Sequence, residues 1–151
     1  MYKRQGSDFV FKKESNDSYD EVYDFLQICR AEKAIAMSVG KFKLARLFKA
    51  FPKRYEIFTA RIDKELASAV ITLQTGPKVV YYFLPGTLEK FKNQSPMVGL
   101  LNYIVTNHVP KKGCIDLGIS SKEGTPQKGL VAFKERMGGV STSKKRFINR
   151  F

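Results

Sequence analysis

With 151 residues, the chain is long enough to form one domain with a buried core. It contains no run of about 18 apolar residues and no signal-peptide pattern, so neither a membrane-spanning helix nor secretion is expected. The formal net charge of +13 favours partners that carry phosphates, such as nucleic acid or anionic lipid headgroups, with a solvated basic surface as the alternative.

Residues 1–7 are expected to be disordered or artefactual, because the first five residues resemble the translated read-through of a sequencing adapter. On this interpretation the natural protein continues upstream of Met1. Residues 8–151 are expected to form a single domain, since they contain neither an internal repeat nor a low-complexity linker.

Two amphipathic helices are predicted after a short strand at residues 9–11. Ser18 and Glu21 form a capping-box pattern at the start of the first helix. The second helix follows the loop through Gly40 and stops at or before Pro52, because proline cannot continue a helix. The apolar faces consist of Val22, Phe25, Leu26 and Cys29 in the first helix, and Leu44, Leu47, Phe48 and Phe51 in the second.

The opposite face of the second helix is basic. It carries Lys43, Arg46 and Lys49, and residues 41–54 hold six basic residues and no acidic one. The end of the chain adds Lys144, Lys145, Arg146 and Arg150, again without an acid.

Three strands are predicted next, at residues 55–62, 66–75 and 78–84, where β-branched and aromatic residues dominate. Short turns at residues 63–65 and 76–77 separate them, which indicates an antiparallel meander. Pro85 and Gly86 are expected to end the third strand, and residues 87–94 are expected to form a polar loop.

A central helix is predicted from Pro96, with Ser95 as its N-cap. Met97, Leu100, Leu101 and Ile104 form its apolar face. Gly99 leaves the backbone bare in the first turn, where amide groups and the helix dipole favour an anion. The alternative is an ordinary crossover helix whose glycine packs against a strand.

The last part of the chain is predicted to contain an inner strand at residues 114–119, a helix with Leu130, Phe133 and Met137, and a terminal strand at residues 141–148. The strand–helix–strand crossover around the central helix is expected to be parallel and right-handed. The predicted fold class is therefore α/β: a three-layer sandwich with a mixed, mostly antiparallel sheet and one parallel βαβ crossover.

Several stretches resemble a known family. They are Asp116-Leu117-Gly118-Ile119-Ser120, the segment from Lys128 to Lys134, Gly138-Gly139, and the helix start from Ser95 to Leu101. Together they look like the C-terminal part of a GNAT-fold N-acyltransferase, most similar to the FemAB-like branch that includes acetyltransferases of polysaccharide and cell-wall metabolism. This resemblance implies the same element order, with the acyl donor in a gap between the two strands that flank the central helix.

The resemblance implies an acyltransferase that moves an acetyl or aminoacyl group from acetyl-CoA, or another acyl-CoA, to an amine of a sugar or cell-wall precursor. Typical members grip coenzyme A with a loop that begins with Arg or Gln and carries spaced glycines. Here the glycine spacing differs and Pro96 removes a donor. FemAB-like relatives depart similarly, and some take the acyl group from aminoacyl-tRNA. The acyl donor is expected to contact Gln94, Ser95, Met97, Val98 and Gly99, together with the backbone of Phe83 and Leu84.

Asp116 and Tyr82 are the predicted catalytic residues, since acyl transfer to an amine requires a group that accepts a proton. For Asp116, the alternative is a structural role in fixing the following loop. Ser120, Glu123 and Lys134 are predicted to bind substrate, although Lys134 also fits an ordinary solvated charge. In many family members a tyrosine on the last helix protonates the leaving thiolate; here that helix offers Phe133, so no general acid is assigned.

Cys29 and Cys114 are expected to be reduced packing residues in a cytoplasmic protein, with a disulfide as the alternative. His108 is expected to be a cation or cap at a helix end, with a cysteine–histidine dyad as the alternative. No spacing of ligands suggests a metal.

Two further functions compete with the enzyme. One is a basic module that binds nucleic acid such as tRNA, and the other is a catalytically incomplete half of a tandem FemAB-like protein that contains a second GNAT-like domain.

Overall fold

The computed structural model describes residues 8–143. The chain divides into two compact units, residues 1–116 and residues 117–151, and each is considered by itself. The predictions for residues 1–7 and for the four basic residues near the C-terminus lie outside the described residues. Of the terminal strand predicted at 141–148, residues 141–143 form no strand and the rest also lies outside them.

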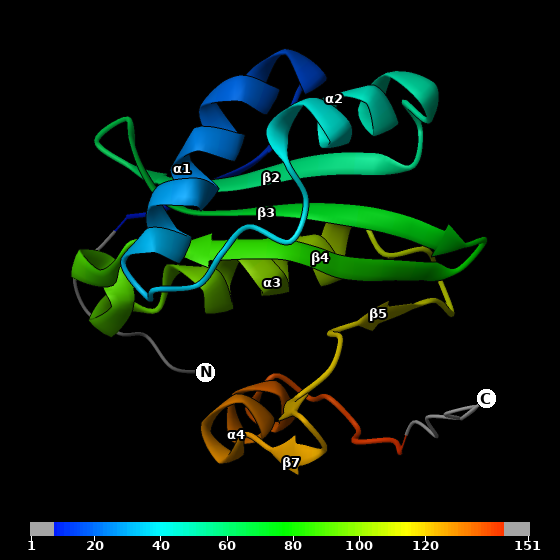
Figure 1. The fold of residues 1–151 in the computed structure, drawn as a ribbon. Coiled ribbons are helices and arrows are strands. Elements are labelled where there is room, and N and C mark those ends of the chain that lie inside the picture. The colour runs from blue at the N-terminus through cyan, green and yellow to red at the C-terminus, as the bar shows by residue number, and fades with distance from the viewer. Residues whose placement is uncertain (1–7, 144–151) are drawn as a thin grey trace, which may run out of the picture. The chain divides into compact units, whose positions relative to one another are not determined.

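The first unit is built on a five-stranded sheet with the order β1-β2-β3-β4-β5. β1 to β4 pair antiparallel and β5 runs parallel to β4, as predicted. Two helices cover one face of the sheet and α3 covers the other (Figure 1), so the predicted fold class is confirmed. The strands are β1 (Val10–Glu14), β2 (Tyr55–Ile62), β3 (Glu65–Gly76), β4 (Val79–Thr87) and β5 (Cys114–Asp116); the helices are α1 (Tyr19–Ala31), α2 (Lys41–Ala50) and α3 (Pro96–Asn107).

The start of α1 differs from the prediction. Ser18 belongs to a short 3-10 helix, η1 (Asn16–Ser18), and its side chain makes no cap hydrogen bond. Its backbone, with ψ of 2°, lacks the extended conformation that lets an N-cap side chain reach the first turn. Glu21 instead pairs with Arg61 of β2 at 2.8 Å, so the expected capping box is wrong.

β4 is longer than predicted, because Pro85 and Gly86 continue the strand instead of ending it. They pair with Val70 and Ala69 of β3. Proline is tolerated where one side of a strand has no partner, and β5 pairs only with the first part of β4. A Cβ atom at Gly86 would lie 2.7 Å from Leu26 Cδ2, so glycine allows α1 to pack closely on β4. The predicted polar loop then contains a 3-10 helix, η2 (Glu89–Gln94).

β5 is shorter than the inner strand predicted at residues 114–119, and within the described sheet it lies at the edge. Cys114 is exposed rather than packed, whereas Cys29 is buried. Both cysteines are free, so the structure contains no disulfide between them.

The second unit contains a hairpin of β6 (Ser121–Lys122) and β7 (Thr125–Pro126), followed by α4 (Lys128–Arg136). Glu123 and Gly124 form the turn with φ of 51° and 82°. Gly138, with φ of 83°, follows the end of α4 in the left-handed conformation that glycine adopts without strain. The helix was predicted, whereas the hairpin was not distinguished from a polar loop.

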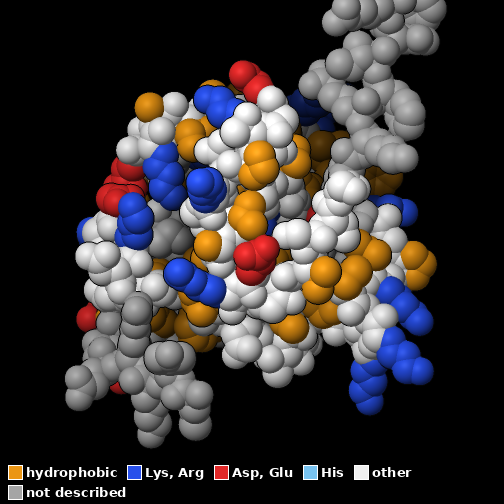
Figure 2. Space-filling model, turned by 90° about the horizontal axis from the view of Figure 1, so that it is seen from below, with side chains coloured by type: hydrophobic (Ala, Val, Ile, Leu, Met, Phe, Trp, Pro, Cys, Tyr) orange, Lys and Arg blue, Asp and Glu red, His pale blue; other side chains and the backbone are white. Residues whose placement is uncertain are grey.

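Basic side chains are spread over the surface and are not confined to one element. Figure 2 views the molecule from below, and Lys and Arg side chains lie there among exposed hydrophobic ones, with fewer acidic side chains. No helix in the described part of the chain combines the length and apolar character needed to cross a membrane.

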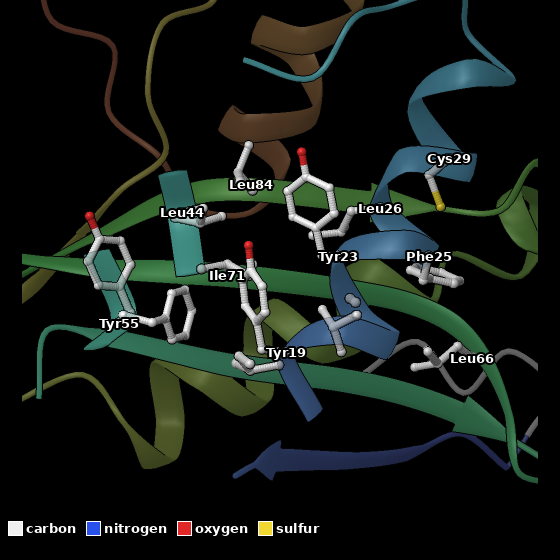
Figure 3. Packing of buried hydrophobic residues seen from close by; sticks show 14 residues of the cluster. Tyr19, Tyr23, Phe25, Leu26, Cys29, Leu44, Tyr55, Leu66, Ile71 and Leu84 are labelled. Carbon is white, nitrogen blue, oxygen red and sulfur yellow. The ribbon is translucent and has the colours of Figure 1, made fainter. Parts of the chain in front are cut away.

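The main core lies between the sheet and the α1–α2 pair (Figure 3). Two tyrosines of α1 bind the end of the following loop and the start of α2: the hydroxyl of Tyr23 donates to the carbonyl of Val39 and that of Tyr19 to the carbonyl of Lys41, each at 2.7 Å. Of the apolar face predicted for α2, Leu44 and Phe48 are buried, whereas Phe51 follows the helix end and is 50% exposed. The buried aliphatic centre comprises Val22, Leu26, Leu44, Ile57, Ile71 and Leu84.

Candidate active site

The pairing between β4 and β5 ends at a defined point in the sheet. Their parallel pairing covers Val79 to Tyr81 on β4, and its last pair is Tyr81 with Asp116. β4 then continues to Thr87 while β5 ends. Beyond Tyr81, the edge of β4 therefore has no strand partner among the described residues.

A β-bulge lies directly after this point. Ile71 of β3 pairs with Leu84 and Thr72 pairs with Tyr82, so Phe83 is the extra residue on β4. A bulge bends its strand and re-aims the residues around it, and bulges are frequent beside active sites. Nothing in the amino-acid pattern of residues 78–84 marks this position.

The bulge decides which side of the sheet each aromatic residue of β4 faces. Phe83 is half-buried against the α1–α2 core, with its ring 5.9 Å from Tyr81 and 6.5 Å from Tyr55. Tyr82 lies on the other face and is 8% exposed. Burial raises the pKa of Tyr82 and so disfavours its phenolate form, which means that the side chain is not a base at neutral pH.

The start of α3 offers fewer free amide groups than the sequence predicts. Pro96 has no N–H, and the N–H of Val98 donates to the carbonyl of Ser95 at 3.0 Å. Ser95 itself has a left-handed backbone, with φ of 53° and ψ of 46°, and its side chain makes no cap hydrogen bond. Met97 is buried, and the side chain of Gln94 is exposed.

Gly99 faces β1. A Cβ atom there would lie 2.3 Å from Cζ of Phe11, so the glycine lets α3 approach the Phe11 ring. That ring stacks on Tyr103 of the same helix, with centroids 6.4 Å apart. This is the packing role that the sequence left open as the alternative, and it holds whether or not a donor binds nearby.

Asp116 is the last residue of β5 and is half-buried. Its Cα partner is Tyr81, which places its backbone at the point where the two strands separate. Asp116 and the Phe83 bulge therefore belong to the same region of the sheet.

The other predicted substrate-binding residues belong to the second unit. Glu123 is exposed at the hairpin tip, and the carbonyl of half-buried Ser120 accepts a hydrogen bond from the N–H of Gln127 at 2.7 Å. Lys134 is only 9% exposed, and its ammonium donates to the carbonyls of Gly118 and Ile119 at 2.8 and 2.9 Å. The alternative of a solvated helix charge at Lys134 is wrong, because these carbonyls replace water around the ammonium group.

His108 is the C-cap residue of α3, which is one of the two helix-end roles predicted, and the lowered pKa of its ring disfavours the other, a cation. Burial and the charge of Lys13 lower the pKa of the imidazole, against an opposing effect of Glu56. The ring lies between Phe58 and Tyr103, at 4.9 and 5.2 Å. Among the described residues, no cluster of His, Cys, Asp or Glu could hold a metal ion. Burial also raises the pKa of Cys29 to about 12, which makes that thiol unreactive.

Comparison with known proteins identifies the family of the chain. The family model described as acetyltransferase (GNAT) domain matches residues 2–123. No curated protein matches by sequence.

Solved structures give the same result for the fold. An aminoglycoside acetyltransferase from an uncultured soil metagenomic sample, in complex with trehalose, has a TM-score of 0.68 and 9% identity, with 95% of each chain covered. A GNAT family acetyltransferase from Elizabethkingia anophelis with acetyl-CoA bound has a TM-score of 0.57 and 16% identity, covering 87% of this chain and 76% of that chain. FemX has a TM-score of 0.66 and 11% identity, covering 86% of this chain and 50% of that chain. At these identities the likeness concerns the fold alone.

Proposed function

We propose that this chain, which belongs to the acetyltransferase (GNAT) domain family, is an N-acyltransferase that moves an acyl group from a coenzyme A thioester to an amine. The observation that carries the proposal is the early end of the β4–β5 pairing, with a bulge at Phe83 directly behind it. An open strand edge with a re-aimed backbone is what an extended ligand with a reactive carbonyl needs.

The proposed role of the bulge is to polarise the donor carbonyl. The thioester supplies an acyl carbonyl that is activated for attack. The amide N–H of Phe83, next to Leu84, would donate a hydrogen bond to the carbonyl oxygen where negative charge develops. One such donor contributes about 10² to 10³ in rate.

Asp116 is the proposed base. Its position at the end of β5 would let the carboxylate take a proton from the acceptor amine. Tyr82 would act through its protonated hydroxyl and not as a base, because burial disfavours the phenolate. Ser120, Glu123 and Lys134 remain proposed acceptor contacts, with Lys134 acting through the loop carbonyls that it binds.

Gln94, Ser95, Met97, Val98 and Gly99 form the proposed segment for the phosphates of the donor. With Val98 N–H already bonded and Gly99 against Phe11, we expect the Met97 amide to contribute most among the backbone groups. The fit is therefore weaker than in a loop with several free amides.

We propose an amino sugar as the acceptor class. Support comes from the aminoglycoside acetyltransferases among the similar structures, whose substrates carry amines on sugar rings. The FemAB-like branch, with a cell-wall precursor as acceptor and aminoacyl-tRNA as donor, is the second candidate, and the likeness to half of FemX favours it.

A pair of variants at one position tests the proposal. Phe83→Pro removes both the ring and the amide N–H, whereas Phe83→Ala removes only the ring. We expect thiol release from acetyl-CoA, measured with a panel of amino sugars, to fall about a hundredfold further in Phe83→Pro than in Phe83→Ala. Proline is tolerated at bulges, and a thermal melt of both variants checks that each is folded.

Equal activity of the two folded variants would remove the bulge amide from the mechanism. If aminoacyl-tRNA stabilises the wild-type chain and acetyl-CoA does not, the acyl donor is aminoacyl-tRNA instead of a coenzyme A thioester. Stabilisation by neither would favour the incomplete half of a tandem protein.

A further inference from the structure

The outward face of α2 presents cations that no acid of the described residues neutralises. Arg46 and Lys49 follow Phe42 at helical spacing, so the three side chains form one stripe on the solvent side. Lys43 lies beside this α2 stripe. In the described part of the chain none of these three cations makes an ion pair, whereas Lys41 is bound to Asp20 and Asp24.

Phe42 is the most unusual member of the α2 stripe. Its ring is 88% exposed, although a phenylalanine normally buries most of its surface. The inner face of the helix is fixed, with Leu44 at 0% and Phe48 at 6% exposure. The hydroxyl of Tyr19 also holds the carbonyl of Lys41, directly before Phe42. The ring therefore cannot turn into the core and is held out in solvent beside the cations.

We propose that the α2 stripe docks the protein on membranes that contain anionic lipid. Lys43, Arg46 and Lys49 would lie at the level of the headgroup phosphates, where each basic residue gains attraction to the surface. Phe42 would enter the boundary between headgroups and acyl chains, as aromatic residues of interfacial helices do. This inference does not depend on acyl transfer.

A membrane fits this surface better than a nucleic acid does. Proteins that hold single strands use a groove with several aromatic rings along it. The α2 stripe is the convex side of one helix and carries one ring at one end. Two clefts among the described residues lie elsewhere: one of about 410 Å³ near Lys13 and Lys53, and one of about 350 Å³ at the β3–β4 turn. A membrane presents charged headgroups above an apolar layer. The α2 stripe presents cations and an apolar ring, so it is complementary to both.

The control must account for the general positive charge of the molecule, because basic side chains also lie on the face seen in Figure 2. The test variant combines Arg46→Gln with Lys49→Gln. The matched control variant combines Lys111→Gln with Lys112→Gln, which removes the same charge from exposed residues outside α2. For the ring, Phe42→Ser is compared with Val10→Ser, because Val10 is another exposed apolar residue, at 65%.

Binding is measured by co-sedimentation of the full chain with vesicles of phosphatidylcholine alone and with added phosphatidylglycerol. We expect binding only when phosphatidylglycerol is present. The Arg46 and Lys49 pair of changes should weaken it about tenfold or more, and Phe42→Ser about tenfold. Each control should weaken it less than about twofold. Thermal melts check that every variant remains folded.

Three outcomes would overturn the proposal. The first is no binding to the anionic vesicles. The second is an equal loss of vesicle binding in the test and control variants. The third is tighter binding to a single-stranded oligonucleotide that depends on Phe42 and Arg46, while vesicle binding does not depend on them. The third outcome would assign the α2 stripe to nucleic acid instead.

Discussion

Gly99 illustrates how a single residue takes its role from a distant partner. The sequence places it in the first turn of a helix, but its contact is with Phe11 on β1, far away in the chain. Local spacing contains no information about that contact. The sequence could therefore predict a bare glycine at a helix start and could not decide between anion binding and packing.

We expect Gly99→Ala to destabilise the protein by about 1–3 kcal/mol, because the new methyl group collides with the Phe11 ring. Gly129→Ala on α4 is the matched control: a Cβ there meets nothing within 4 Å, so alanine should be neutral or stabilising by up to about 1 kcal/mol. Urea unfolding of both variants measures the difference. A Gly99→Ala variant as stable as wild type would show that α3 can move away from β1.

His108 carries a polar atom that the fold does not satisfy. Its Nε2 is buried without a hydrogen-bond partner among the described residues. Burial and the charge of Lys13 lower the pKa of the ring, so the folded protein resists protonation that the unfolded chain accepts. The sequence predicted the position at the helix end, but not the aromatic rings around it.

The sign of the pH dependence follows from this lowered pKa. The contribution of neutral His108 is fully present above the unfolded pKa of about 6.5, and it is lost as the pH falls from there towards the folded pKa. We expect the urea midpoint to drop over this range, and His108→Phe to remove part of the drop. Asn107→Ala, at the neighbouring exposed residue, should leave it unchanged. An identical pH profile in His108→Phe would assign the effect to other groups.

Among the elements, periodic pattern determined what the sequence could predict. The apolar repeats of α1, α2 and α3 and the β-rich character of β2, β3 and β4 gave the correct element types. The errors fall where a tertiary contact overrides a local signal. Pro85 and Gly86 usually end a strand, yet here they extend β4 because they pair with β3, and Gly86 also leaves room for α1.

The candidate site itself depends on such an element-level feature. The sequence predicted that two strands would flank α3, the family resemblance implied that they would diverge, and the parallel pairing that ends at Tyr81 agrees with both. The bulge at Phe83 was not predictable, since it arises from the register between β3 and β4 and not from any residue preference. Identifying Phe83 as the re-aimed residue required coordinates.

For the whole molecule, charge is the property that sequence gives directly. The net charge is +13, and the ion pairs in the described part of the chain join mostly exposed side chains. Exposed pairs contribute only about 0–1 kcal/mol each. Repulsion among the excess cations acts throughout the molecule and is reduced by salt, because salt screens charges beyond about 10 Å at 0.1 M.

We therefore expect the melting temperature to rise by a few degrees as sodium chloride increases from low to physiological concentration, where about 1 kcal/mol corresponds to roughly 2–4 °C. Lys43→Gln, Arg46→Gln and Lys49→Gln combined should reduce the rise, because they remove uncompensated charge from α2. Sodium sulfate at matched ionic strength separates screening from anion binding. Equal shifts of the melting temperature in the two salts indicate screening. A larger shift in sulfate that disappears in the triple variant indicates anions bound at the α2 stripe. A melting temperature that falls with salt would mean that attractive ion pairs, such as Arg61 with Glu21, outweigh the repulsion.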